Sequence, residues 1–465
     1  MQQPFGWRDT VLAALVFVIA VAARVLYVVA VVQDGQQPPF QVQDPQTSIT
    51  LNRRDTNTPV RTTDADRLVK NISTNHAFQG RVQLIPGGQE ETTAHVAPAY
   101  PYLVGLTLQW IDDEGATARV IVWTQCVLGA LTAMLYMLFA QQVFGSRLVG
   151  FLAGLLTAIH PFWIINVSEL QDGALASFAV ACCLCLGTAA AQRGSPVASF
   201  AFGLWLAGMA LVRAALLPFA FICCCWVLLR FRKQPRSWLC ALLVILGFGN
   251  GMAPWTVRNY QQFGEIVPIT DSLFFHMLMG NNKNAKGGPQ SDAAIWNSLM
   301  AVSQQGATAQ SNEARRDRLL ADEVWQNIRY DTGGMIEKRL WSGLCFTFGA
   351  SWFLLPGSGM AHGNHHADLS AWIPHDISLA LVGMMLVMLV FGLLGWRWSY
   401  GWKRQSSLAS LAIFWIPLPY ILSHAELYSG PRLPLDGVLL CYAAFALAWI
   451  VPAGRRFTLP AADSQ

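Results

Sequence analysis

The sequence has few charged residues. Asp, Glu, Lys and Arg make up 12% of its 465 residues, against roughly 25% in an average soluble protein. Apolar residues reach 54%, and the mean hydropathy is +0.37. These values exclude an ordinary soluble enzyme and favour a polytopic membrane protein. A chain of this length could form two or three soluble domains, but apolar spans cover most of it, so we expect one integral membrane bundle.

Metal-site cysteine motifs, basic blocks and repeats are also missing. The ten cysteines lie in or beside apolar runs, and the one pair at i, i+3 spacing, Cys182 and Cys185, stands inside the apolar run ACCLCLG rather than in a metal-site context. We therefore interpret them as small buried hydrophobic residues rather than as disulfides or metal ligands. The net charge is only +4 and no block of Lys and Arg is present, so we expect no nucleic-acid partner. No internal repeat is visible, which argues against an inverted-repeat transporter.

Long apolar runs dominate what is present. A segment needs roughly 20 mostly apolar residues to cross the hydrocarbon core of a membrane. The first apolar run is too long for a signal peptide and lacks a small-residue cleavage site, so we expect it to be a retained anchor. About ten segments are candidate spans: 11–32, 118–140, 148–166, 170–191, 197–212, 214–231, 237–254, 377–396, 407–423 and 434–452.

The positions of Lys and Arg orient these spans, because cytoplasmic loops are enriched in both residues. With the N-terminus inside, every cytoplasmic connection has at least one cation, and the short outer connections carry only Arg213, Arg258 and Arg432. A charge at bilayer depth is costly, so two short helices that meet at Arg213 fit better than one long helix through it. We therefore predict a cell-membrane protein with both termini cytoplasmic.

The predicted fold is an all-α polytopic membrane protein with two large extracytoplasmic segments, 33–117 and 255–376. We divide the chain into an N-terminal membrane module (1–254) that includes the first of these segments, the second segment (255–376), and C-terminal membrane helices with a short cytoplasmic tail (377–465).

Shorter helices are expected within the two outer segments. Apolar residues at helical spacing predict a helix over 311–331. The apolar stretches 98–110 and 340–356 are too short to count as spans, so we expect both to lie in or dip into the membrane interface.

The first outer segment contains the most informative polar residues. Asp64 and Asp66 lie two positions apart, and His95 precedes an apolar stretch that contains Pro98 and Pro101. A carboxylate at a membrane surface, followed by a segment able to lie along that surface, suits chemistry on a lipid-borne substrate. The alternative is a solvated loop whose acids have no role.

Ionisable residues from other parts of the chain are predicted on the same face. Each has a simpler interpretation: an acid can cap a helix, and an arginine can extend to lipid headgroups. Together, however, arginines and acids from separate spans describe a cavity for an anionic ligand, because the guanidinium fork suits phosphate. The histidines of the HGNHHAD stretch resemble a metal patch, although a solvated loop is the simpler interpretation. The residues in question are Glu169, Asp172, Arg213, Arg258, His424, Glu426 and Arg432, with His362, His365 and His366 in the histidine stretch.

A set of short motifs occurs in a particular order along nearly the whole chain: Asp64-Ala65-Asp66-Arg67-Leu68, Pro98-Ala99-Tyr100-Pro101, Ser168-Glu169-Leu170, Leu211-Val212-Arg213, PWTVRNY from Pro254 to Tyr260, Gly280-Asn281-Asn282, and PRLPLD from Pro431 to Asp436. The set resembles the GT-C superfamily of membrane glycosyltransferases, specifically the bacterial branch similar to protein O-mannosyltransferases and the aminoarabinose transferase of lipid A (glycosyltransferase families 39 and 83). PWTVRNY is the most specific of these motifs.

The resemblance implies an inverting transfer of a sugar from a polyprenyl-phosphate donor to a lipid, glycan or protein acceptor on the extracytoplasmic side. Asp64 would be the general base, with Asp66 as its neighbour or substitute. Cations must stabilise the departing lipid phosphate. The candidate donor- and substrate-binding residues are Arg213, Arg258, Arg432, Glu169, His95, Tyr100 and Asn281. No metal is required, although the acids and His95 could hold a divalent ion.

Two positions depart from the family pattern. Leu68 stands where the family has an aromatic residue, and Leu433 stands where it has a tyrosine. These differences keep open a non-catalytic glycan-binding or assembly protein on the same scaffold. A secondary transporter is the other alternative, but the predicted charges lie at one face rather than along a path through the bundle.

Overall fold

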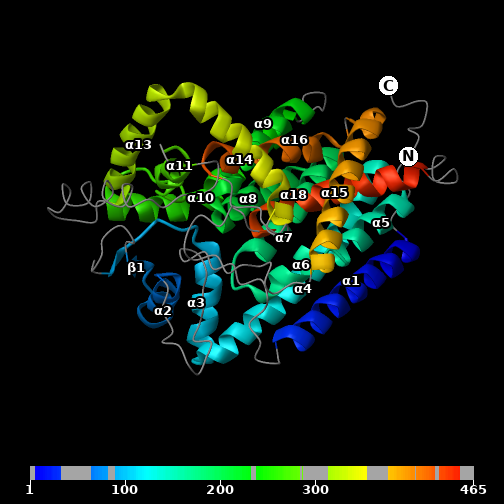
Figure 1. Cartoon of the computed structure of the whole chain (residues 1–465), viewed down its shortest axis with the longest axis horizontal. Helices are drawn as coiled ribbons and strands as arrows, with labels where there is room; N and C mark the ends of the chain where they lie inside the picture. Colours follow the sequence, from blue (N-terminus) through cyan, green and yellow to red (C-terminus); the bar gives the residue numbers. More distant parts are fainter. Residues whose placement is uncertain are drawn as a thin grey trace.

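The structure is a computed structural model that describes residues 6–32, 64–81, 90–231, 237–282, 285, 313–352, 375–403, 405–424 and 429–450. In these residues, nearly all regular structure is helical and packs as a bundle (Figure 1). The prediction of an all-α membrane protein is confirmed, with one small two-stranded ladder added. Residues 33–63 of the first outer segment, the HGNHHAD stretch and Glu426 lie outside the described residues.

Each of the ten predicted spans coincides with helix. The helices are α1 (Trp7–Tyr27, continued by the π-helical turn η1, Val28–Val32), α4 (Glu114–Phe144), α5 (Arg147–Ala158) with α6 (Pro161–Ile165) and η2 (Asn166–Ser168), α7 (Gly173–Arg193), α8 (Pro196–Val212), η3 (Ala214–Leu216) with α9 (Leu217–Phe231), α10 (Ser237–Phe263), α15 (His375–Trp398) with η5 (Ser399–Trp402), α16 (Ser407–Trp415) with α17 (Leu418–Leu422), and α18 (Ser429–Ile450).

The number of membrane crossings is not fixed by these helices. By length and composition, five described helices can each cross a membrane, and the bent pair formed by α5 and α6–η2 would be a sixth. Three further apolar helices, 196–212, 214–230 and 407–422, are shorter. A hydropathy pattern does not show where a helix is interrupted, because an interruption can arise at a single residue such as Pro161, which lacks an N–H group. Ten crossings therefore stays a prediction.

The two predicted outer segments form compact additions to the bundle. The first contains α2 (Asp64–Asn75), β1 (Gln79–Arg81), β2 (Glu90–Thr92) and α3 (Ala99–Ile111), and β1 pairs antiparallel with β2 so that Gly80 faces Glu91. The second contains α11 (Leu273–Gly280), α13 (Glu313–Tyr330) and α14 (Thr332–Trp352). In Figure 1, α2, β1, α11 and α13 gather at one end of the molecule, and α1 and α5 extend toward the other.

Two helices extend beyond the predicted boundaries. Helix α10 continues through Pro254 to Phe263, so the predicted end of the span at 254 is wrong and Arg258 is helical. The reason is packing: Trp255 is buried with Phe78 and Leu68, which outweighs the hydrogen bond lost at the proline. Residues 340–352 of the predicted stretch 340–356 form the second part of a longer helix, because α14 already begins at Thr332 and runs to Trp352.

Close helix packing depends on glycine at one crossing. A β-carbon at Gly203 of α8 would overlap the carbonyl oxygen of Val244 on α10, and one at Gly247 would overlap that of Phe200. Small residues let helix backbones approach in membrane proteins, where lipid provides little hydrophobic drive for association. The main core extends from α4 to α18 across the bundle, so the C-terminal helices share their packing with the N-terminal ones.

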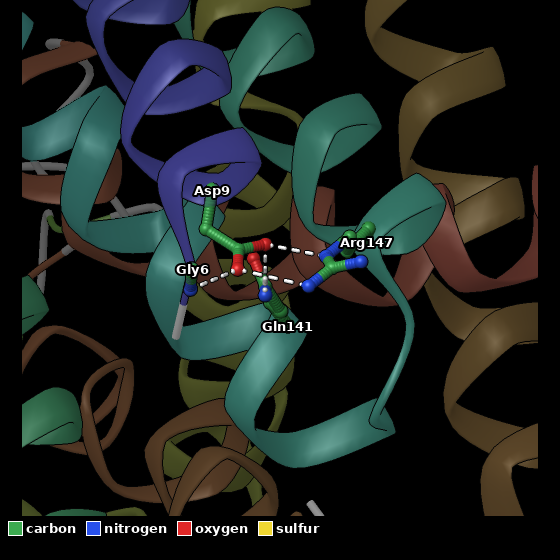
Figure 2. Close-up of polar contacts among 4 residues, drawn as sticks. All are labelled: Gly6, Asp9, Gln141 and Arg147. Carbon is green, nitrogen blue, oxygen red and sulfur yellow. Dashed lines mark hydrogen bonds and ion pairs between the residues drawn. The ribbon is translucent and has the colours of Figure 1, made fainter. Parts of the chain in front are cut away.

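A buried carboxylate holds α1 against α4 and α5 near the N-terminus (Figure 2). Asp9 is fully buried. It accepts hydrogen bonds from the backbone N–H of Gly6 at 2.8 Å, from Gln141 Nε2 at 2.8 Å, and from Arg147 Nε at 2.7 Å and Nη2 at 3.1 Å. Burial of a charge is tolerated when it is paired and fully hydrogen-bonded. We call these four residues the Asp9 cluster.

A second buried charge supports the break between α5 and α6. Arg24 of α1 is fully buried and donates from Nη1 to the carbonyl oxygens of Ala20 at 2.9 Å and Ala158 at 3.2 Å. Because α5 ends at Ala158, this last carbonyl has no donor within the helix and needs one from elsewhere. One turn later, the hydroxyl oxygen of Tyr27 lies 3.4 Å from the hydroxyl oxygen of Ser168. Helix α1 thus contacts both ends of the bent segment.

Candidate active site

The first outer segment is fixed between two apolar clusters. Leu68 and Ile72 of α2 pack with Phe78 and Trp255. On another face of α2, Val69 and the partly buried Ala65 pack with a second apolar cluster that contains Tyr100 and Leu170. These contacts join α2 to the apolar cluster that also contains Leu170, the residue after Glu169.

The two predicted base candidates begin this helix. Asp64 is the first residue of α2, and its side chain lies outside the described part of the structure. Asp66 is described and is buried, with 2% of its surface exposed. The assignment of either acid as the base therefore stays a prediction.

A glutamine connects two other predicted residues, Tyr100 and Glu169. The Tyr100 hydroxyl donates to Gln125 Oε1 at 3.0 Å. Gln125 Nε2 in turn donates to the carbonyl oxygens of Val167 and Glu169, each at 2.9 Å. The Glu169 carboxylate accepts from Asn166 Nδ2 at 3.1 Å. Helices α3 and α4 and the η2 turn therefore meet through side chains that the sequence separates widely.

Arg213 is also bound close to this turn. Its Nε donates to Asp172 Oδ2 at 2.9 Å, and its Nη2 pairs with Asp172 Oδ1. Asp172 occupies the N-cap position of α7, but its side chain makes no capping bond. The capping interpretation of Asp172 is therefore replaced by an ion pair. The pair is partly open, since 11% of the Arg213 side chain and 25% of the Asp172 side chain are exposed.

Electrostatics join these residues into one group. Burial raises the pKa of the Tyr100 phenol well above its ordinary value, and the negative charges of Asp172 and Glu169 raise it further. The phenol therefore stays protonated and keeps donating to Gln125. We call Tyr100, Gln125, Glu169, Asp172 and Arg213 the Glu169 group.

Arg258 belongs to a different set of contacts. It donates from Nη1 to the carbonyl oxygen of Thr93 at 2.9 Å and from Nη2 to that of Phe78 at 3.0 Å. Its guanidinium carbon lies 4.7 Å from the centre of the Trp255 ring, a cation–π geometry. In this arrangement Arg258 holds the strands of the first outer segment against α10.

His95 lies beside the second outer segment. Its ring contacts Phe275 and His276 of α11, with centroid distances of 5.3 and 6.2 Å. His276 Nδ1 lies 3.1 Å from His424 Nε2. Burial lowers the pKa of His424 well below its ordinary value, with smaller contributions from His276 and Arg339. The neutral form of His424 is therefore the stable one.

Asn281 and Arg339 hold the same region together. Asn281 Nδ2 donates to the carbonyl oxygens of Met277 at 2.7 Å and Leu422 at 3.1 Å. Arg339 of α14 donates to Gly280 O at 2.5 Å and also to the last carbonyl oxygens of α17. Burial lowers the pKa of Arg339 to about 10, so it keeps its charge at neutral pH. Asn281 is thus a backbone-binding residue in this structure.

The described histidines are not arranged as a metal site. Among the residues that the structure describes, no group of three His, Cys, Asp or Glu side chains is placed to hold a metal ion. His276 and His424 hydrogen-bond one another instead of directing their nitrogens to a common point. The histidines of the HGNHHAD stretch lie outside the described residues, so a bound divalent ion stays a prediction.

Arg432 is the third predicted phosphate ligand, and its contacts are separate. It is buried on α18, donates from Nε to Asp436 Oδ1 at 2.8 Å, and also donates to the carbonyl oxygen of Thr347 on α14. Arg213, Arg258 and Arg432 thus have three different sets of contacts, and their predicted convergence on a lipid phosphate stays a prediction.

Sequence reasoning missed several residues that hold the site. Gln125 and Arg24 each lie inside a predicted span, and a polar side chain in an apolar run was the available signal. Arg339 gave none, because it lies in an ordinary mixed stretch. Leu68 and Leu433, which depart from the family pattern, are both buried core residues with 3% and 1% exposure.

Comparisons with known proteins show the fold. No family model and no curated protein matches the sequence. Three solved structures of the oligosaccharyltransferase AglB from Archaeoglobus fulgidus match at TM-scores of 0.52 to 0.53 and 13–14% identity. They contain an inhibitory peptide and a dolichol-phosphate, a tethered acceptor peptide, and zinc with sulfate, respectively.

The matches cover 94–96% of this chain and 50–51% of the archaeal protein, so this chain spans about half of the protein it matches. ArnT from Cupriavidus metallidurans, bound to undecaprenyl phosphate, aligns over 96% of this chain and 79% of its own length at 13% identity, with a TM-score of 0.32 that supports no conclusion. The chain therefore shares the fold of about half of this archaeal oligosaccharyltransferase, which agrees with the GT-C-like membrane fold that the motifs predict.

Proposed function

We propose that this protein is an integral membrane glycosyltransferase that moves a sugar from a polyprenyl-phosphate donor to an extracytoplasmic acceptor. The observation that carries the proposal is the fold match to an oligosaccharyltransferase whose structure contains a dolichol-phosphate. The Glu169 group supports it, because it provides a partly exposed arginine, two carboxylates and a buried phenol at the junction of α3, α4 and α7.

One carboxylate takes the acceptor's proton. As the acceptor oxygen forms its bond to the anomeric carbon, the bond from that carbon to the phosphate oxygen breaks, which inverts the sugar's configuration. Asp64 is the proposed base and Asp66, two residues further along α2, is the substitute. Their helix packs against the apolar cluster of Tyr100 and Leu170, beside the Glu169 group.

Arg213 is the best-placed cation for the departing lipid phosphate. Charge develops on the phosphate oxygens as the bond breaks, and a preorganised guanidinium stabilises it. Asp172 holds the Arg213 fork in position before the substrate binds. Arg258 and Arg432 are occupied by backbone carbonyls and, for Arg432, by Asp436, so phosphate binding by either requires those contacts to change. Glu169 is placed to orient a sugar hydroxyl.

The remaining parts of the proposal rest on sequence. The positive-inside pattern supports cytoplasmic termini and an extracytoplasmic site in the cell membrane. The transferred sugar is a hexose or pentose, and the acceptor is a lipid, a glycan or a protein. The archaeal neighbour has been solved with zinc, but the described residues here do not fit a metal, and no step above uses one.

A transfer assay tests the proposal. Full-length protein in lipid nanodiscs is incubated with radiolabelled polyprenyl-phosphate sugars and membrane acceptors. We expect Asp64→Asn to lower transfer by about 10²–10⁴-fold, the usual contribution of a general base. Asp322→Asn, an exposed acid on α13, is the matched control and should be unaffected.

Three outcomes would change the proposal. Unchanged transfer by Asp64→Asn, with loss in Asp66→Asn, moves the base to Asp66. Binding of the labelled lipid by wild-type protein without transfer to any acceptor favours a glycan-binding protein. Solute flux in proteoliposomes without transfer favours a transporter.

A further inference from the structure

Gln125 is a buried amide within the predicted apolar span 118–140, and its three hydrogen bonds all reach segments outside its own helix. Only 1% of its surface is exposed. Both of its bonded carbonyl partners, Val167 and Glu169, lie in the same turn, and its oxygen accepts from Tyr100 on a different element. These contacts fix the amide orientation. If the nitrogen and oxygen were exchanged, the oxygen would face two carbonyl oxygens and no donor.

The surroundings of this amide exclude water. Tyr100, Val167 and Leu170 are buried, with 4%, 1% and 5% of their surfaces exposed, and they form one apolar cluster with residues of α4. Removing the amide therefore takes the bonded side-chain partner from the Val167 carbonyl and the Tyr100 phenol, and one of two donors from the Glu169 carbonyl. Water cannot replace these bonds easily. The link is consequently stiff.

The two segments joined by Gln125 both lead to the proposed reaction centre. Helix α3 begins at Ala99, shortly after His95. On the other side, the bonded carbonyl of Glu169 is three residues before Asp172, which holds Arg213. The turn between them is short and internally bonded, since Gln171 N–H donates to Glu169 O at 2.9 Å and Glu169 N–H donates to Asn166 O at 3.3 Å. A shift at Glu169 is therefore passed to Asp172.

We propose that Gln125 is a positioning residue that sets the first-segment helix α3 and the Glu169–Asp172 turn at one fixed separation. This inference rests on the proposed function, because the role it assigns is alignment of the acceptor side with Arg213 on the donor side. Gln125 touches no substrate. It acts on α3 through Tyr100, and on the Glu169–Asp172 turn through the backbone carbonyls of Val167 and Glu169.

The test uses three single variants and one double variant in full-length protein in nanodiscs. Gln125→Met keeps the side-chain length and removes all three bonds, whereas Tyr100→Phe removes only the bond to α3. Thr132→Val is the control: Thr132 is buried on the same helix, but its hydroxyl donates only to Leu128 O within that helix.

In the transfer assay, we expect Gln125→Met to lower kcat per folded molecule by about tenfold while KM for the lipid donor changes by less than about twofold, because misalignment affects the transition state more than binding. Tyr100→Phe should lower kcat less. The double variant should equal Gln125→Met, because both changes break the same link and their effects are not additive. A purely structural role would lower the yield of folded protein and leave kcat per folded molecule unchanged.

Hydrogen exchange of the peptide that contains residues 166–172 gives a readout independent of activity. Gln125→Met should speed exchange there, whereas Tyr100→Phe and Thr132→Val should not. Unchanged exchange in Gln125→Met, multiplicative kinetic effects in the double variant, or wild-type kcat in Gln125→Met would each overturn the inference. If wild-type protein transfers no sugar, the proposed function fails, and faster exchange in Gln125→Met still establishes the link itself.

Discussion

Two ion pairs in this molecule differ in how open their carboxylates are. In the Asp9 cluster, the carboxylate has no exposed surface and accepts from four donors, while 35% of the Arg147 side chain is exposed. In the Asp172–Arg213 pair, the carboxylate is the more exposed partner, at 25%. A carboxylate that is fully enclosed and satisfied has no capacity for a ligand. A partly open pair can exchange one partner for a substrate. The Asp9 cluster is therefore structural, and the Asp172–Arg213 pair is the better candidate for chemistry.

The largest expected effect separates the two pairs by activity. Arg213→Gln removes the guanidinium from the Glu169 group and should lower sugar transfer by roughly 100-fold or more, because one preorganised group at a developing charge contributes that much. The unfolding midpoint should change little, since the pair is partly solvated. Transfer kinetics and a melting curve on the same preparation test both statements. Wild-type activity in Arg213→Gln would remove this residue from the phosphate site.

For the Asp9 cluster, the second prediction is the opposite: a loss of stability without a loss of activity. Asp9→Asn removes the buried charge and leaves Arg147 without its anion, and we expect a loss of roughly 2–3 kcal/mol in stability, at the low end for a broken buried pair because Arg147 can reach solvent. Activity per folded molecule should stay at the wild-type level. Asp172→Asn is the matched comparison and should lose less stability but more activity. Equal stability losses in the two variants would contradict the distinction.

The third and smallest effect concerns the hydrogen-bonded histidine pair, His276 and His424. The folded pKa of His424 lies well below its unfolded value because of burial, so the stability that this group contributes is complete above about pH 6.5. Below that pH, His424 binds a proton in the unfolded chain but not in the folded chain. The free energy of unfolding therefore falls by at most about 1.4 kcal/mol per pH unit. Unfolding midpoints at pH 7.5 and 5.5 measure this. His424→Gln should flatten the difference, and an unchanged slope would assign it to other groups.

Much of the fold was predictable from local sequence. Apolar runs placed helix at all ten predicted spans, and Arg213 correctly divided α8 from α9. The helix predicted at 311–331 is confirmed as α13, with Leu320 and Val324 packed against Phe275. These predictions succeeded because helix formation and membrane burial depend on neighbouring residues in the chain. The ends of α10 and α14 were mispredicted because tertiary packing, rather than local pattern, determines them.

The site was less predictable. The motifs singled out Tyr100, Glu169 and Arg213, and the structure links all three in the Glu169 group, but their role as site residues stays a prediction. The expectation that three arginines converge finds no support in their observed contacts, because Arg258 and Arg432 bind backbone carbonyls elsewhere. A sequence shows that an arginine is present near a membrane surface, but its hydrogen-bond partners are set by segments far away in the chain.

The sequence by itself determined the membrane class, the positions of the helices and the superfamily resemblance, since each depends on composition or on short motifs. Only the tertiary structure decided which polar groups meet. Gln125 donates to a carbonyl oxygen 44 residues away, and Arg213 pairs with an acid 41 residues away. Arg258 donates to a carbonyl oxygen 180 residues away. In a buried interior every polar group needs a partner, and the packing of the helices determines which partner is within reach.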